Sequence, residues 1–154
     1  GLYVLLKRVN RSLSLLTAWF RVVYAAMFGS ALVHLMNVLQ LVSGADYFRG
    51  FETDQLHAQA MLSFNTFEYG WNIALVVFGL HLLLLGYLVF KSGFMPKILG
   101  ILLIVASFGY LIDSLGKILL PNYNPTIAIF TFVGELLLVF WLLIKGSRLP
   151  EENE

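Results

Sequence analysis

The sequence predicts an all-α, polytopic transmembrane helical bundle in a single domain of residues 1–146. Hydrophobic residues make up 59% of the chain and charged residues only 12%, which leaves too little polar surface to cover a soluble globule. The segment 71–91 is almost continuously apolar, and about 20 such residues let a helix cross a hydrocarbon core of about 30 Å. Because helices satisfy their own backbone in lipid, we expect four full helical spans and the end of a truncated upstream helix.

The first predicted elements lie on either side of a basic loop. Residues 1–6 are apolar and end at the cation Lys7, so we expect them to close a helix that begins upstream of this chain. Residues 13–43 form the first full span. At 1.5 Å per residue this helix is about 46 Å long, more than the bilayer core, so it must tilt or protrude.

Turn residues and cations bound the remaining segments. We expect an amphipathic segment at residues 53–67, which is either an interfacial helix or the protruding end of the next span. Full spans follow at residues 68–90, 96–120 and 126–145. Charged residues then form a tail over residues 147–154.

The loop cations fall almost entirely on one side of these spans. That side carries Lys7, Arg8, Arg11, Lys91, Lys97, Lys145 and Arg148, and the opposite side carries Arg49. Cytoplasmic loops of membrane proteins hold an excess of Lys and Arg. We therefore expect the basic loops and the C-terminal tail to face the cytoplasm.

Small residues predict where helices approach each other closely. They recur at helical spacing in three spans, at Ala25 and Gly29, at Gly79 and Gly86, and at Ala106, Gly109, Asp113 and Gly116. We expect these stripes to face neighbouring spans, although glycine is also common in transmembrane helices generally.

Several runs of residues carry a resemblance to a known family. They are LYVLLKRVNRSLSLLTAWFR, FGLHLLLLGYLVFKSGFMPKILGILLI, GYLIDS, LLPNY and GELLLVFWLLIKG. Together they resemble domain of unknown function 4386, a bacterial and archaeal membrane family, over nearly the whole chain. The resemblance implies the cytoplasmic (inner) membrane of a prokaryote, and further apolar segments upstream as partners of these helices. It implies no activity, so no catalytic residue is carried over.

Three ionisable residues share one predicted depth. Counted from the basic ends, Arg21, His81 and Glu135 lie about 13 to 15 Å into three different spans. Because a lone charge at this depth is costly, we expect Arg21 and Glu135 to form an ion pair with His81 within reach of one water, and Tyr24 nearby. This buried polar layer is either a structural clasp that fixes helix register, or a proton or ligand relay.

A second polar layer is predicted near the opposite, outer face. Its members are His34, Asn37, Glu68, Asn72, Asp113 and Lys117, with His57 above them. In one interpretation Asp113 and Lys117, one helical turn apart, simply pair with each other. In the other, His34, His57, Glu68 and Asp113 form an outward-facing metal or ligand site, although no ligand spacing typical of a metal site supports it.

The sequence argues against the common cofactors and against a nucleic-acid partner. The chain has no cysteine, which excludes disulfides, thiolate metal sites and iron–sulfur clusters. His34 and His81 differ by about 20 Å in depth and so cannot share a haem. Phosphate-binding loops, nucleophile elbows and nucleic-acid motifs are absent from the sequence. The lipid bilayer and a small ligand remain as partners.

Three functions fit these residues. The first is small-molecule or ion and proton handling, as a transporter-like or ligand-binding membrane protein that uses the buried layer of Arg21, His81 and Glu135. The second is an intramembrane enzyme with an outward-facing site of histidine and carboxylate, for which no catalytic residue is assigned. The third is a structural membrane subunit.

Overall fold

The computed structural model describes residues 1–43, 50–120 and 122–145, and this part of the chain contains helices and no strand. The helices are α1 (Leu2–Leu6), α2 (Arg11–Val42), α3 (Thr53–Lys91), α4 (Lys97–Leu119), α5 (Ala128–Thr131) and α6 (Val133–Lys145). The predicted all-α class is therefore confirmed. The tail predicted at 147–154 lies outside the described residues, as do Arg49 and Arg148.

Three helices, α2, α3 and α4, are long and apolar enough to cross a membrane. Four full spans preceded by a truncated helix are not confirmed. Residues 126–145 do not form one helix, because α5 ends at Thr131 and α6 begins at Val133. With 13 residues, α6 reaches about 20 Å, short of a hydrocarbon core of about 30 Å.

The amphipathic segment predicted at 53–67 and the span predicted at 68–90 belong to one continuous helix. α3 has 39 residues and is about 58 Å long at 1.5 Å per residue. Residues 53–67 are therefore the first part of the same helix and not a separate helix. Asp54 in the first turn and Lys91 in the last complement the helix dipole.

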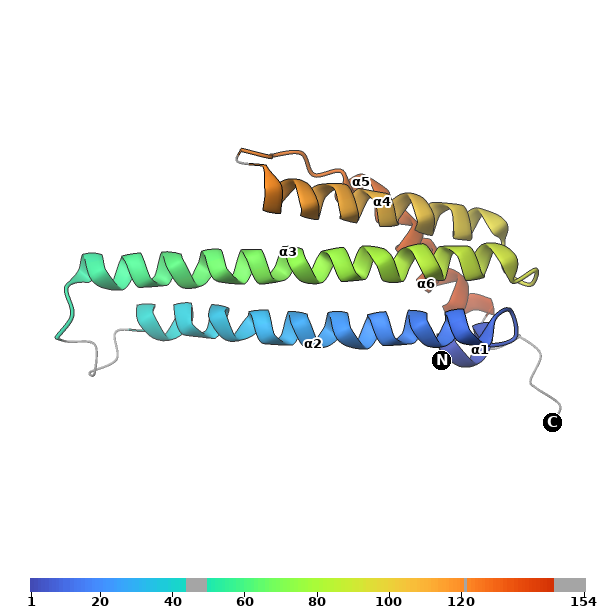
Figure 1. Cartoon of the computed structure of the whole chain (residues 1–154), viewed down its shortest axis with the longest axis horizontal. Helices are drawn as coiled ribbons and strands as arrows, with labels where there is room; N and C mark the ends of the chain where they lie inside the picture. Colours follow the sequence, from blue (N-terminus) through green and yellow to red (C-terminus); the bar gives the residue numbers. More distant parts are fainter. Residues whose placement is uncertain (44–49, 121, 146–154) are drawn as a thin grey trace.

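The helices form an open row with α3 in the middle (Figure 1). α3 packs against α2 on one side and α4 on the other, α6 packs on α4, and α1 packs on α2. The start of α2, the end of α3, the start of α4 and the end of α6 lie at one end of the bundle, which we call the basic end (Figure 1). At the other end α2 and α3 extend past α4.

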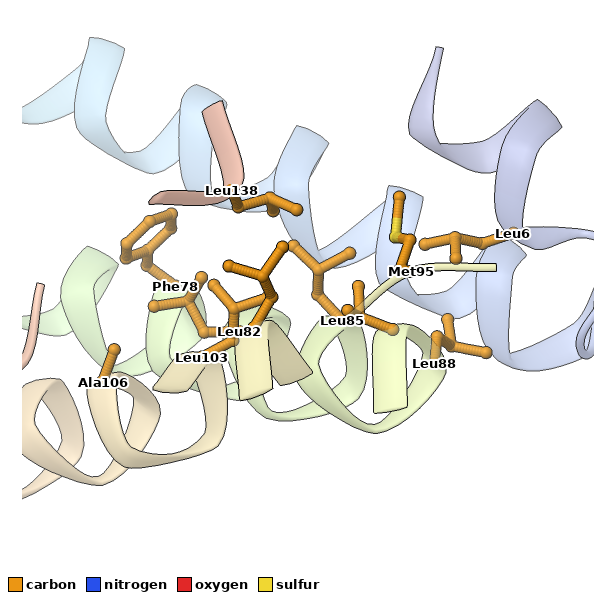
Figure 2. Close-up of a cluster of buried hydrophobic side chains, with 11 residues drawn as sticks. Leu6, Phe78, Leu82, Leu85, Leu88, Met95, Leu103, Ala106 and Leu138 are labelled. Atoms are coloured by element: carbon orange, nitrogen blue, oxygen red, sulfur yellow. The ribbon is translucent and has the colours of Figure 1, made fainter. Parts of the chain in front are cut away.

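The core lies near the basic end (Figure 2). The side chains of this core that Figure 2 labels are Leu6, Phe78, Leu82, Leu85, Leu88, Met95, Leu103, Ala106 and Leu138. α3 and α4 approach closely here, because a Cβ on Gly86 would lie 2.8 Å from the carbonyl oxygen of Gly100. The close approach predicted for Gly86 is confirmed, whereas Gly29 has no such neighbour within 4 Å.

Candidate functional site

A cavity of about 370 Å³ lies against α1, α2, α3, α4 and α6 near the basic end, and we call it the inner cavity. Leucine is the most frequent residue in its walls, and Leu82, Leu85, Leu103 and Leu138 lie side by side in Figure 2. Arg21, His81 and Glu135 also line it, each from a different helix. The structure thus lines one cavity with the three ionisable residues of the predicted layer. Only His81 is buried, whereas Glu135 is half-buried and Arg21 is exposed, so the prediction that all three are buried is wrong for Arg21.

His81 is held in one orientation inside this wall. The side chain is 5% exposed, and its Nδ1 lies 2.9 Å from the carbonyl oxygen of Thr17 on α2. A carbonyl only accepts hydrogen bonds, so Nδ1 carries the proton, and Nε2 of the neutral ring is left as an acceptor. The hydroxyl of Thr17 donates to the carbonyl of Leu13 at 2.7 Å, and the ring of Phe78 stacks on His81 at 5.9 Å.

The predicted ion pair between Arg21 and Glu135 is not among the contacts of the described residues. The Arg21 guanidinium lies instead over two aromatic rings, 5.2 Å from the centre of Phe78 and 5.6 Å from that of Tyr24. A cation is attracted to the electron-rich face of such rings. Arg21 and Glu135 both line the inner cavity. The two charges therefore face a common space without closing it.

Glu135 is half-buried in the first turn of α6. Its carboxyl group interacts with the side chain of Tyr110 on α4. Its Oε1 atom is buried and has no hydrogen-bond partner. The sequence reasoning missed Tyr110, although its position about 20 Å from the start of α4 is close to the depth of the buried layer.

A second cavity, of about 420 Å³, lies farther from the basic end, and we call it the outer cavity. Its polar or ionisable lining residues are Tyr24, Asn72, Tyr110, Asp113, Ser114, Lys117, Thr126 and Glu135. Asn72, Asp113 and Lys117 were predicted for the outer polar layer, and Tyr24 for the buried one. Of the lining residues, Asn72 Oδ1, Ser114 Oγ and Glu135 Oε1 are buried without a hydrogen-bond partner.

Asp113 has a structural role that the sequence did not suggest. Its carboxylate accepts hydrogen bonds from the Tyr123 hydroxyl at 3.0 Å and from the Ala128 backbone N–H at 2.7 Å. The pairing with Lys117 is therefore replaced by an anchor for the segment that leads into α5. Partial burial and the hydrogen bond to Asp113 raise the pKa of Tyr123, because a phenolate there would be repelled by the carboxylate.

The other residues of the predicted outer layer do not converge. His34, Asn37, Glu68 and His57 line neither the inner nor the outer cavity. Among the described residues, no group of three or more histidine, aspartate or glutamate side chains is placed to hold a metal ion. The four residues considered as metal ligands are thus not brought together. His34 lies on α2 and His57 and Glu68 lie on α3, whereas Asp113 lies on α4 in the wall of the outer cavity.

Comparisons with known proteins identify the family. The family model described as domain of unknown function (DUF4386) matches residues 1–146. The chain belongs to this family. An uncharacterized protein of Archaeoglobus fulgidus is 39% identical over 151 residues, which cover 98% of this chain and 76% of that protein. No solved structure matches the chain. The resemblance to domain of unknown function 4386 predicted from the sequence is confirmed, and its apolar helices fit a membrane protein.

Proposed function

We propose that this member of the family is an integral membrane protein that handles a small molecule or an ion in its inner cavity. One observation carries the proposal. Arg21, His81 and Glu135 come from three helices and line one cavity of about 370 Å³. Ionisable residues inside a membrane protein are costly and commonly mark a pathway or a ligand site. If these residues only held the helices together, their charged groups would instead contact each other directly.

The position in the membrane is part of the proposal. Lys7, Arg11, Lys91, Lys97 and Lys145 flank the helix ends at the basic end of the bundle. Their clustering supports a cytoplasmic membrane in which the basic end faces the cytoplasm. The tail that follows α6 would lie on the same side.

A fourth crossing is proposed for α5 and α6 together. α5 ends at Thr131 and α6 begins at Val133, and Phe132 between them lines the outer cavity. Interrupted helices at membrane depth are tolerated where they line a cavity, and transporters build their binding sites from them. Glu135 follows this interruption by less than one turn, so the break and the proposed site coincide.

The proposal requires the inner cavity to admit polar solutes, and the absence of native cysteine makes this testable. Ala18 lines the cavity, whereas Ala106 is 0% exposed and lines neither cavity. We expect the Ala18→Cys variant to react with the membrane-impermeant anion sulfonatoethyl methanethiosulfonate. The matched Ala106→Cys variant should not react. Combining Ala18→Cys with Arg21→Gln should slow the anionic reagent by about tenfold relative to a cationic one, because Arg21 concentrates anions.

An Ala18→Cys variant that stays unreactive from both sides of the membrane would overturn the proposal. That result would mean that solutes do not reach the layer of Arg21, His81 and Glu135. It would favour the third function predicted from the sequence, a structural membrane subunit. A structural membrane subunit already has one observation in its favour, because only 6% of the apolar stretch of α2 is buried within the chain.

A further inference from the structure

We propose that the species handled at this site is the proton, and that Glu135 carries it between the two cavities. This inference rests on the proposed function and specifies its substrate. The inner and outer cavities lie on opposite sides of a layer that contains Arg21, Tyr24 and Phe78. The residues that line both of them are Phe78 and Glu135. Glu135 is thus the titratable group shared by the two linings.

The outer cavity has the chemistry of a hydrated route. Asn72 Oδ1, Ser114 Oγ and Glu135 Oε1 are all buried without a protein partner, and all three residues line this cavity. Buried polar atoms nearly always have a hydrogen-bond partner, either protein or water. At about 420 Å³ the cavity has room for several waters, each of which would find polar partners on its wall. A file of waters therefore satisfies these atoms and leads to Glu135.

The inner cavity offers a group that can relay the proton onward. The hydrogen bond to Thr17 fixes the proton of His81 on Nδ1, so Nε2 is available as an acceptor. In the proposed step the Glu135 carboxylate takes a proton from a hydronium ion in the outer cavity and leaves a water there. It then releases that proton either directly to water in the inner cavity or to His81 Nε2, which passes it on to that water. Glu135 and His81 both return to their starting state, and the net result is one proton moved from the outer to the inner cavity.

The layer between the cavities explains why other cations would be rejected. The rings of Phe78 and Tyr24 lie under the Arg21 guanidinium, so the passage is bounded by apolar surface and a fixed positive charge. Arg21, His81 and the hydroxyls of Tyr24 and Tyr110 are the titratable or charged groups near Glu135. A metal cation would have to pass the guanidinium with its hydration shell, whereas a proton passes by protonation of the carboxylate.

The test uses the full chain in vesicles loaded with a pH-sensitive dye. A potassium gradient and valinomycin impose a membrane potential that drives protons inward. We expect the wild-type protein to acidify the lumen, and Glu135→Gln to lower the initial rate by at least about tenfold, because the amide cannot take up the proton. The matched control is Glu68→Gln. Glu68 is exposed and lines neither cavity, so this variant should keep the wild-type rate.

Labelling separates failure of the proton route from failure of the site. Ser114 and Ser107 are both buried on α4 with unpartnered hydroxyls, but only Ser114 lines the outer cavity. We expect Ser114→Cys to react with a small thiol reagent and Ser107→Cys to stay unreactive. If Ala18→Cys is labelled but wild type moves no protons, the proton route is overturned and the proposed ligand site stands. Normal flux in a folded Glu135→Gln variant, or an unreactive Ser114→Cys, also overturns the route.

Discussion

The two halves of α3 belong to one helix but have different surroundings. In the packed half, from Trp71 to Lys91, ten residues are buried, whereas no residue is buried in the outer half, from Thr53 to Gly70. The packed half lies between α2 and α4, and the outer half extends beyond α4 alongside α2 (Figure 1). Continuity of a helix depends on local hydrogen bonds, so it does not reveal which part is covered.

The candidate site involves only the packed half of α3. Every α3 residue that lines a cavity lies between Trp71 and Leu85, within the packed half. The inner and outer cavities both have walls from α2, α3, α4 and α6, and the outer half of α3 has no α4 beside it (Figure 1). The polar residues of the outer half, His57 and Glu68, therefore remain apart from the cavities although their chemistry resembles that of the site. The difference shows that coverage, and not the presence of ionisable residues, determines where a site forms.

The largest expected effect comes from filling the closest contact of the packed half. A side chain on Gly86 would meet the Gly100 carbonyl at 2.8 Å. We expect Gly86→Leu to destabilise the fold by about 3 kcal/mol or more, because two helix backbones must separate. Gly29→Leu is the matched control, because nothing lies within 4 Å of that position. Thermal unfolding in detergent, followed by circular dichroism, measures both variants, and equal losses would contradict the contrast.

Core truncation should have the next largest effect. Leu103 is 0% exposed in the cluster of Figure 2, and Leu62 in the outer half is 68% exposed. We expect Leu103→Ala to cost about 2 to 5 kcal/mol, since a cavity replaces packed side-chain atoms. Leu62→Ala should change the unfolding free energy by less than about 0.5 kcal/mol. A large loss at Leu62 would show that the outer half is covered as well.

The sequence was sufficient to predict the class, the family and the three helices that are long and apolar enough to cross a membrane. Runs of apolar residues fix the existence of a span, because the bilayer core sets the required length. The last span was predicted as continuous, since residues 126–145 are mostly apolar and no proline or glycine stands at the break at Phe132. That break occurs where the next turn packs on α4, because a Cβ on Gly134 would lie 2.8 Å from the Leu102 side chain.

The sequence predicted the depth of the candidate site in the bundle, but it did not predict how each helix is rotated about its own axis. Counting residues from the basic ends placed Arg21, His81 and Glu135 at one level, and the three residues line one cavity. Pairing also depends on how each helix is turned about its axis, which a count of residues does not fix. In the structure Arg21 therefore lies over the rings of Phe78 and Tyr24 instead of forming the predicted ion pair with Glu135.

The next largest loss of stability should come from removing a carboxylate that accepts two hydrogen bonds. Asp113 accepts hydrogen bonds from Tyr123 and from the Ala128 backbone, whereas Asp54 is exposed in the first turn of α3. We expect Asp113→Ala to cost about 1 to 3 kcal/mol, because two donors lose their acceptor. Asp54→Ala should cost less than about 1 kcal/mol, the usual contribution of a charge near a helix end. Denaturant titration of both variants tests the difference, and a smaller loss at Asp113 would contradict it.

The smallest expected effect concerns the start of α2. Asn10 caps this helix, because its side-chain oxygen accepts a hydrogen bond from the Leu13 backbone N–H at 2.9 Å. We expect Asn10→Ala to cost about 1 kcal/mol and to fray the first turn, which hydrogen exchange at residues 11–14 would detect. Asn65 is an exposed residue inside the outer half of α3. Asn65→Ala should be neutral or slightly stabilising, because alanine favours a helix interior. Equal destabilisation by both variants would mean that Asn10 does not act as a cap.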